Sequence, residues 1–178
     1  PVCHNPFEAF SLRDEDHAPS EGVLTSGIPK DRDATEAFTA VREAYLAYFD
    51  RNDPCDSRRL LGRALRLRPT EPLYHALDGF LALNVGAPGE AEQSFDAALK
   101  LGHADEERMA SLHLWRARAR DVKGDRASAL MDYRAAVGAS KADPQVRRAA
   151  QKGLEKSFSA AKARKVRVDF AYADVVSP

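Results

Sequence analysis

The feature that most constrains this chain is a short pattern that recurs at nearly constant spacing along its middle. Ala64-Leu65-Arg66-Leu67 returns as Ala98-Leu99-Lys100-Leu101, 34 residues further on. A third copy follows 38 residues later, in which the glycine, alanine and aromatic positions reappear as Gly124, Ala129, Tyr133 and Ala136. Fixed periods of this length are typical of stacked helical hairpins, in which each unit buries its apolar face against its neighbours.

Apolar residues at three- and four-residue steps predict where these helices lie. Prolines and turn residues separate the apolar runs and mark where each helix begins or ends. The expected elements are a first helix over 34–49 capped by Asp33, a second helix from Pro54 that ends before Pro69, a second hairpin over 72–101 turning at 84–89, and a third hairpin over 105–139 turning at 123–125.

Two small residues in the second hairpin fall where its two helices would cross. Gly79 and Ala91 lie at these positions, and a larger side chain at either would hold the two backbones beyond the ~8–10 Å at which helices pack. The corresponding position of the first hairpin holds the bulky Tyr45, so its packing is less defined. The pattern predicts an all-α fold in which 34–140 form three antiparallel helical hairpins.

The two ends of the chain differ from the repeat. Residues 1–33 carry prolines and glycines at short intervals, together with three basic and seven acidic side chains, and we expect irregular or extended structure there. Residues 141–165 are expected to form a basic capping helix with a thin apolar side. Alternating apolar residues predict an extended strand over 166–178, whose open edge would need a covering partner.

Charge and hydropathy limit the classes of partner. Lysine plus arginine number 27 and aspartate plus glutamate 27, whereas nucleic-acid-binding domains usually carry a strongly basic balance. No apolar run approaches the ~20 residues that span a bilayer, so we expect neither a nucleic acid nor a membrane as partner. Residues 141–167 nevertheless hold nine basic and two acidic side chains, which leaves open a solvated face or a docking surface for an acidic partner or the acidic 1–33 segment.

No set of side chains has the spacing of a known catalytic or metal site. Cys3 and His4 are adjacent, and neighbours in an extended segment point to opposite sides, so they make a poor nucleophile and base. No two histidines or cysteines have the spacing of a helical metal site. We therefore expect no catalytic residue, no metal and no cofactor, and we predict that this chain is not itself an enzyme.

Cysteine usage bears on the compartment. Cys3 and Cys55 are the only cysteines and lie far apart in the sequence, so a disulfide framework is not indicated. The pair could bond in an oxidising compartment, but the prediction is two free thiols in a soluble, cytoplasmic protein. Because the chain begins at Pro1 instead of methionine, we expect a processed or truncated piece whose targeting information is missing.

The repeated positions resemble the signature of the tetratricopeptide repeat, in which small, small, aromatic and small residues follow in fixed order. They are Gly79, Ala91, Phe95 and Ala98 in the second hairpin and Ala117, Ala129, Tyr133 and Ala136 in the third. Ala64, Leu65, Leu67 and Pro69 resemble the closing residues of an earlier copy. The resemblance covers roughly 38–140 and implies hairpins stacked as a right-handed superhelix.

Tetratricopeptide domains are mostly protein-binding scaffolds that hold ligands on the inner faces of the first helices. By this resemblance, the concave face that would bind a protein or peptide is lined by Arg42, Leu46, Phe49, Leu73, Phe80, Asn84, Leu114, Arg118 and Asp121. The family's chaperone-tail clamp requires lysines and asparagines at five such places, and only Arg42 fits, so a chaperone co-factor is not expected. The resemblance predicts a non-catalytic interaction or assembly scaffold.

A second resemblance concerns the two ends together with the repeats. Pro1-Val2-Cys3, the run over 6–12 and the close over 168–174 are similar to the non-catalytic tail of some bacterial penicillin-acyltransferase-like N-terminal-nucleophile hydrolases. This resemblance implies an alternative function. The chain would then be an accessory domain of an amidohydrolase or acyltransferase, and its partner would be a covalently linked catalytic domain outside this chain.

Overall fold

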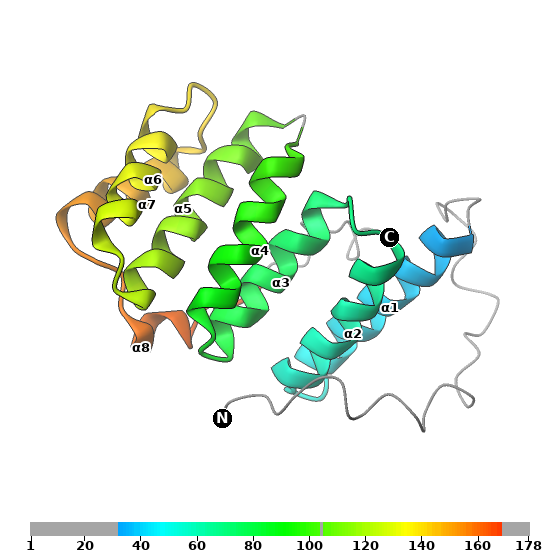
Figure 1. The fold of residues 1–178 in the computed structure, drawn as a ribbon. Helices are drawn as coiled ribbons and strands as arrows, with labels where there is room; N and C mark the ends of the chain where they lie inside the picture. The colour runs from blue at the N-terminus through cyan, green and yellow to red at the C-terminus, as the bar shows by residue number, and fades with distance from the viewer. Residues whose placement is uncertain (1–31, 104, 169–178) are drawn as a thin grey trace.

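The computed structural model describes residues 32–103 and 105–168, which form eight helices and, within these ranges, no strand (Figure 1). The predicted all-α class is therefore confirmed. None of these helices is long and apolar enough to cross a membrane. The helices are α1 (Arg32–Phe49), α2 (Pro54–Leu67), α3 (Pro72–Asn84), α4 (Pro88–Leu101), α5 (Glu106–Lys123), α6 (Arg126–Gly138), α7 (Pro144–Glu155) and α8 (Ala160–Ala163).

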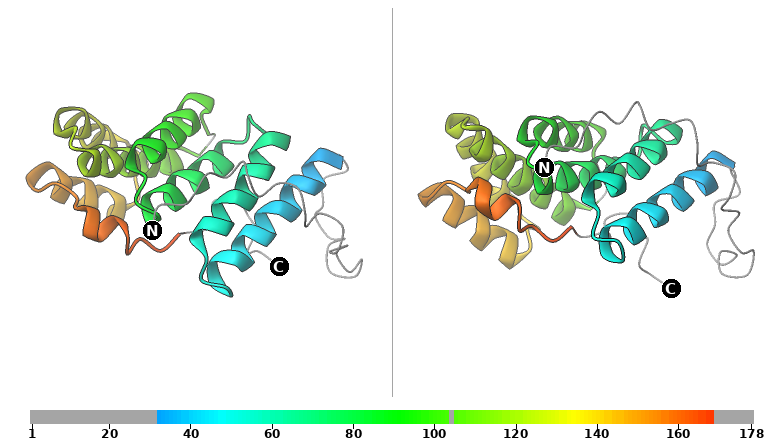
Figure 2. Two further views of the ribbon diagram at one scale, coloured as in Figure 1. Left: turned by 60° about the horizontal axis from the view of Figure 1, so that its bottom comes forward. Right: turned by 90° about the horizontal axis from the view of Figure 1, so that it is seen from below.

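Consecutive helices pack as pairs that follow one another in chain order. α1 packs on α2, α3 on α4 and α5 on α6, while α2 contacts α3, α4 contacts α5 and α6 contacts α7. Figures 1 and 2 show these pairs as successive units, with α7 beside the third pair. The boundaries of all three hairpins agree with the predicted ones to within two residues.

Local sequence signals account for these boundaries. Four helices begin with proline, whose fixed φ suits the first turn and whose missing N–H has no intrahelical partner there. Asp53 Oδ1 caps α2 by accepting hydrogen bonds from the backbone N–H of Cys55 (3.1 Å) and Asp56 (2.9 Å). α5 is followed by Gly124, whose φ of 95° is left-handed and favours glycine.

The core consists of small residues packed around a few rings. The alanine and aromatic positions of the repeat are at most 1% exposed, and they are Ala91, Phe95, Ala98, Ala117, Ala129, Tyr133 and Ala136. An ideal Cβ on Gly79 would lie 2.6–2.8 Å from three atoms of the Phe95 ring, so the backbone of α3 rests directly on that ring. Gly153 of α7 meets the Tyr133 ring of α6 in the same way.

The first hairpin reaches a close crossing by another route. Ser57 of α2 is 0% exposed, and its Oγ donates a hydrogen bond of 2.7 Å to the carbonyl of Ala44 on α1. Tyr45, which occupies the small-residue position of the repeat, is half-buried and packs on Phe49 with ring centroids 4.7 Å apart. The small residue at this crossing is therefore Ser57, which lies 34 residues before Ala91 and holds the equivalent position of the repeat.

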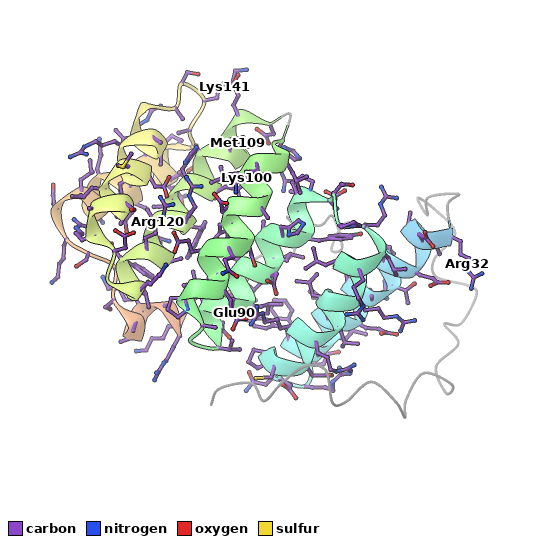
Figure 3. All side chains as sticks on the ribbon, viewed as in Figure 1. Arg32, Glu90, Lys100, Met109, Arg120 and Lys141 are labelled. Atoms are coloured by element: carbon purple, nitrogen blue, oxygen red, sulfur yellow. The ribbon has the colours of Figure 1, made fainter. Side chains whose placement is uncertain are left out.

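Ion pairs join each hairpin to the next. Arg58 of α2 pairs with Asp78 of α3 (2.8 Å) and with Glu90 of α4 (2.6 Å), whose position at the start of α4 is visible in Figure 3. Between α4 and α5, Arg116 pairs with Asp96 at 2.8 Å, and Arg120 pairs with Glu92 at 2.9 Å. The hairpin order is thus fixed by charge as well as by apolar packing.

Asp132 of α6 is the buried centre of this charged region. Its side chain is 4% exposed and accepts hydrogen bonds from His113 Nδ1 (3.0 Å), Arg116 (2.7 and 2.8 Å) and Arg120 (2.9 Å). Burial opposes ionisation of Asp132, but the hydrogen bonds from Arg116 and His113 outweigh it and lower the pKa of the carboxyl group. The carboxylate therefore holds α5 against α6.

The basic helix predicted over 141–165 is divided in the structure. α7 ends at Glu155, Lys156 is extended (φ −141°, ψ 131°), and α8 restarts after Ser159, whose side chain caps it by accepting from the Lys162 N–H. The interruption lets Phe158 leave the helical path and contact α5. The sequence signal for this break is the pair of serines around Phe158, because serine favours caps over helix interiors.

Two further expectations concern the chain ends. No strand pairing occurs at 166–168, and the rest of the predicted 166–178 strand lies outside the described residues, as does 1–31.

The prediction of free thiols is wrong for Cys55, which is disulfide-bonded, while Cys3 lies outside the described residues. Separation along the sequence does not report the Cα distance on which disulfide formation depends.

The crossing at Gly79 can be tested by adding a side chain. We expect Gly79→Leu to lower the free energy of unfolding by about 3 kcal/mol, because the first added carbon already meets the buried Phe95 ring. Gly62→Ala is the matched control, since its Cβ meets only Arg66 Nη1 at 3.9 Å and should gain about 0.5–1 kcal/mol. Urea denaturation measures both, and an unchanged midpoint for Gly79→Leu would contradict the close crossing.

The state of Asp132 predicts a dependence of stability on pH. Its folded-state pKa is lowered, so the carboxylate contributes stability at neutral pH that is lost as pH falls through that folded pKa. Asp132→Asn should cost about 3 kcal/mol at neutral pH and remove part of the decline below about pH 4. Denaturation at neutral and acid pH measures this, and a decline as steep as that of the wild type would argue against it.

Candidate functional site

The most informative surface is the face that α1, α3 and α5 form together, because the end of the described chain lies on it. Residues 156–168, called the closing segment below, leave α7 and run past α5 and α3 towards α1 (Figure 2). The segment is irregular except for the single turn of α8. It therefore contacts the first helix of each of the three hairpins.

Three side chains hold the backbone of the closing segment. Asp121 of α5 accepts a hydrogen bond of 2.8 Å from the Phe158 N–H. Asn84 of α3 donates from Nδ2 to the carbonyls of Arg164 (3.1 Å) and Val166 (3.0 Å).

Tyr48 of α1 completes this set. Its hydroxyl donates to the Val166 carbonyl and accepts from the Val168 N–H, both at 3.3 Å. Since Asp121, Asn84 and Tyr48 all bond to main-chain atoms, this part of the recognition does not depend on the side chains of the bound segment.

Apolar contacts add selectivity to this anchoring. Phe158 packs edge-on against Trp115 of α5, with ring centroids 6.5 Å apart. Ala163 and Val168 are each 2% exposed and belong to the main core cluster. The face thus accepts an aromatic ring, a small residue and a β-branched residue in that order along the segment.

Arg118 lies beside the aromatic contact. Its guanidinium carbon is 4.3 Å from the centre of the Trp115 ring and 4.7 Å from that of Phe158, within the range of cation–π attraction. Burial lowers the pKa of Arg118, although a guanidinium stays protonated in proteins. The charge is therefore kept between two rings in a desolvated position.

Asp121 connects the face to the core. Its side chain is 0% exposed and, besides Phe158, binds Arg126 (3.0 and 3.1 Å) and the Tyr133 hydroxyl (2.7 Å). Burial together with the hydrogen bond to Asp121 raises the pKa of Tyr133, so the phenol stays protonated and donates. The acceptor for the closing segment is thus oriented by two further donors.

Of the nine residues predicted to line a partner-binding face, four contact the closing segment. Asn84, Arg118 and Asp121 do so as described, and the guanidinium of Arg167 lies 5.5 Å from the ring centre of Phe49. The resemblance to the tetratricopeptide family gave these four positions, and the contacts that they make here are with the chain's own closing segment.

The other five predicted residues have different surroundings. Phe80 and Leu114 are only 2% and 3% exposed and belong to the two core clusters. Arg42 and Leu46 are exposed on α1, and Leu73 is half-buried on α3.

Sequence reasoning missed two residues of this face. Tyr48 carried no signal, because its partners are main-chain atoms more than a hundred residues away. Trp115 packs on Phe80 with ring centroids 4.9 Å apart, and its other contacts are with Arg118 and Phe158. A tryptophan one turn before an arginine is the sequence signal that could have identified Trp115.

Comparisons with known proteins add no identification. No protein-family model matches the sequence, and no curated protein matches it. In the two described ranges, no group of three or more histidine, cysteine, aspartate or glutamate side chains is arranged to hold a metal ion.

The anchoring by Tyr48 gives a test of the closing segment. We expect Tyr48→Phe to speed exchange of the Val168 amide hydrogen by about fivefold, the effect of losing a net ~1 kcal/mol hydrogen bond. The Lys162 amide, bonded within the turn to Ser159, is the internal control. Hydrogen exchange by NMR measures both, and equal rates at Val168 in the two proteins would show that the tyrosine does not hold the segment.

Proposed function

We propose that this chain is a tetratricopeptide-like helical-repeat scaffold that binds an extended protein segment across the α1–α3–α5 face and catalyses no reaction. The observation that carries the proposal is the anchoring of the closing segment by Asp121, Asn84 and Tyr48, one side chain from each first helix. These groups bond to main-chain atoms, which every extended peptide presents. Main-chain bonds of this kind supply affinity, and side-chain pockets supply specificity.

Burial of the repeated positions supports the tetratricopeptide part of the proposal. Ala91, Phe95 and Ala98 are buried on α4, and Gly79 of α3 lies against the Phe95 ring, which supports the resemblance to that family. Ala117, Ala129, Tyr133 and Ala136 are buried together with α7 in the second core cluster. We infer a right-handed superhelical stack with the α1–α3–α5 face on its inner side.

The closing segment indicates the chemistry of the partner. A segment that replaces it would carry an aromatic residue for the Trp115 and Arg118 site, followed by small and β-branched residues at the places of Ala163 and Val168. Such a partner competes with the closing segment, whose effective concentration is high because it is part of the same chain. Binding in this way requires only exchange of one extended segment for another.

The proposal can be tested with a full-length variant whose own segment is weakened. We expect a labelled peptide of sequence 156–168 to bind Phe158→Ser/Val168→Ser more tightly than wild type, because the face is then open. Adding Asn84→Ala and Tyr48→Phe should weaken that binding by about tenfold or more, since each removes about 1 kcal/mol of hydrogen bonding. Fluorescence anisotropy measures the affinities, and circular dichroism checks that each variant is folded.

A matched control separates peptide binding at the α1–α3–α5 face from nonspecific binding. Arg42→Ala changes an exposed residue of α1 and should leave the peptide affinity unchanged. Equal affinity of the open variant with and without Asn84→Ala/Tyr48→Phe would refute the role of these side chains. Failure of the peptide to bind the folded open variant would refute the binding face itself.

A further inference from the structure

A second site lies at the end of the stack, away from Asn84 and Tyr48. A pocket of about 650 Å³ opens between α5, α6, α7 and the start of the closing segment. Its lining residues are Arg118, Tyr133, Gln145, Arg148, Ala149, Lys152, Gly153, Glu155, Lys156, Ser157, Phe158 and Lys162. The close crossing of α6 and α7 at Gly153 and Tyr133 forms one wall.

The pocket is strongly basic. Five lining side chains are cationic and only Glu155 is acidic; the cations are Arg118, Arg148, Lys152, Lys156 and Lys162. None of these five forms an ion pair with a carboxylate among residues 32–103 and 105–168. By contrast, Arg58, Arg116, Arg120 and Arg126 all pair with carboxylates inside the stack.

Arg118 distinguishes this pocket from an ordinary solvated face. Exposed lysines need no partner, but Arg118 is desolvated and is held between Trp115 and Phe158 instead of beside an acid. A charge that is desolvated without a counter-charge is costly, and an anionic ligand would repay that cost. The packed rings also fix the direction of the guanidinium, so the site is already formed before a ligand arrives.

The spacing of the cations favours one shape of anion. Arg148 and Lys152 are four residues apart on α7, which places them about 6 Å apart along one side of the helix, and Lys156 follows four residues later as the first residue beyond its end. In an extended peptide, alternate side chains on one face are about 6.6–6.8 Å apart. An extended segment running along α7 would therefore present every second side chain to one of these cations.

We infer that this pocket binds an extended acidic segment of a partner protein, with carboxylates at alternate positions facing Arg148, Lys152 and Lys156. Arg118 and Lys162, which also line the pocket, would contact the same segment. Gln145 and Ser157 offer uncharged hydrogen-bonding groups for its backbone. This inference goes beyond the α1–α3–α5 face, although the two sites share Arg118 and Phe158. Arg148 and Lys152 belong to the pocket alone and Asn84 and Tyr48 to the face alone, so variants of these residues test the two sites separately.

The test uses the full chain and a labelled peptide in which glutamate alternates with serine. A peptide with glutamine in place of glutamate is the neutral control, and one with its glutamates in a single block has the same charge but another spacing. We expect the alternating peptide to bind, several-fold more tightly than the block peptide, and the neutral peptide not to bind. Binding should weaken as salt is raised, because the pairs are partly exposed.

Charge reversal locates the site. Lys152→Glu/Lys156→Glu should weaken the alternating peptide by about tenfold or more, because two attractive pairs become repulsive. Arg134→Glu/Lys141→Glu is the matched control, since it makes the same change in net charge at two exposed residues outside the pocket. Anisotropy gives the affinities, and circular dichroism confirms that both variants are folded.

Several results would overturn the inference. Equal loss of binding in the two double variants would mean general charge attraction, and equal affinity for the alternating and block peptides would remove the extended fit. Displacement of the peptide by tripolyphosphate at concentrations far below the peptide's own dissociation constant would assign the pocket to small polyanions instead. Absence of binding at low salt would leave the basic residues as a solvated face.

Discussion

The rest of this structure depends on close helix crossings, at which the backbone of one helix contacts an aromatic side chain of its neighbour. Gly79 lies against Phe95 and Gly153 against Tyr133, while Ser57 bonds to the α1 backbone at the crossing of α1 and α2. Because the cores are mostly alanine, little side-chain volume separates the helices, and these contacts set their spacing. The ion pairs between hairpins and the face formed by α1, α3 and α5 follow from that spacing.

Tyr133 shows how closely core and surface are linked at the end of the stack. Its ring supports α7 at Gly153 and lines the basic pocket, and its hydroxyl donates to Asp121. Asp121 in turn binds the Phe158 backbone and Arg126, whose Nη2 donates to the Leu154 carbonyl at the end of α7. The tyrosine at the aromatic position of the third hairpin therefore donates a hydrogen bond to Asp121 in addition to supporting α7. The phenylalanine at the same position of the second hairpin has no hydroxyl to donate.

The sequence was sufficient for the hairpins but only partly for the face. Prolines, aspartate caps and apolar periodicity are local signals, so the boundaries of α2 to α6 could be predicted from them. The bond from Ser57 to Ala44 and the role of Tyr48 depend on residues brought together by folding. Phe80 and Leu114 share the phase expected of an inner face, yet neighbouring helices cover them, which periodicity cannot detect.

The closing segment changes the mechanical character of the stack. In a linear array each hairpin contacts only its neighbours, so the end units can open independently. Here Tyr48 bonds to Val166 and Val168, which are 118 and 120 residues away in the chain, and joins the first unit to the last. The contacts of the stack therefore close on themselves through the closing segment. A change in the curvature of the stack would strain this segment, and opening of one end unit would weaken contacts of the other.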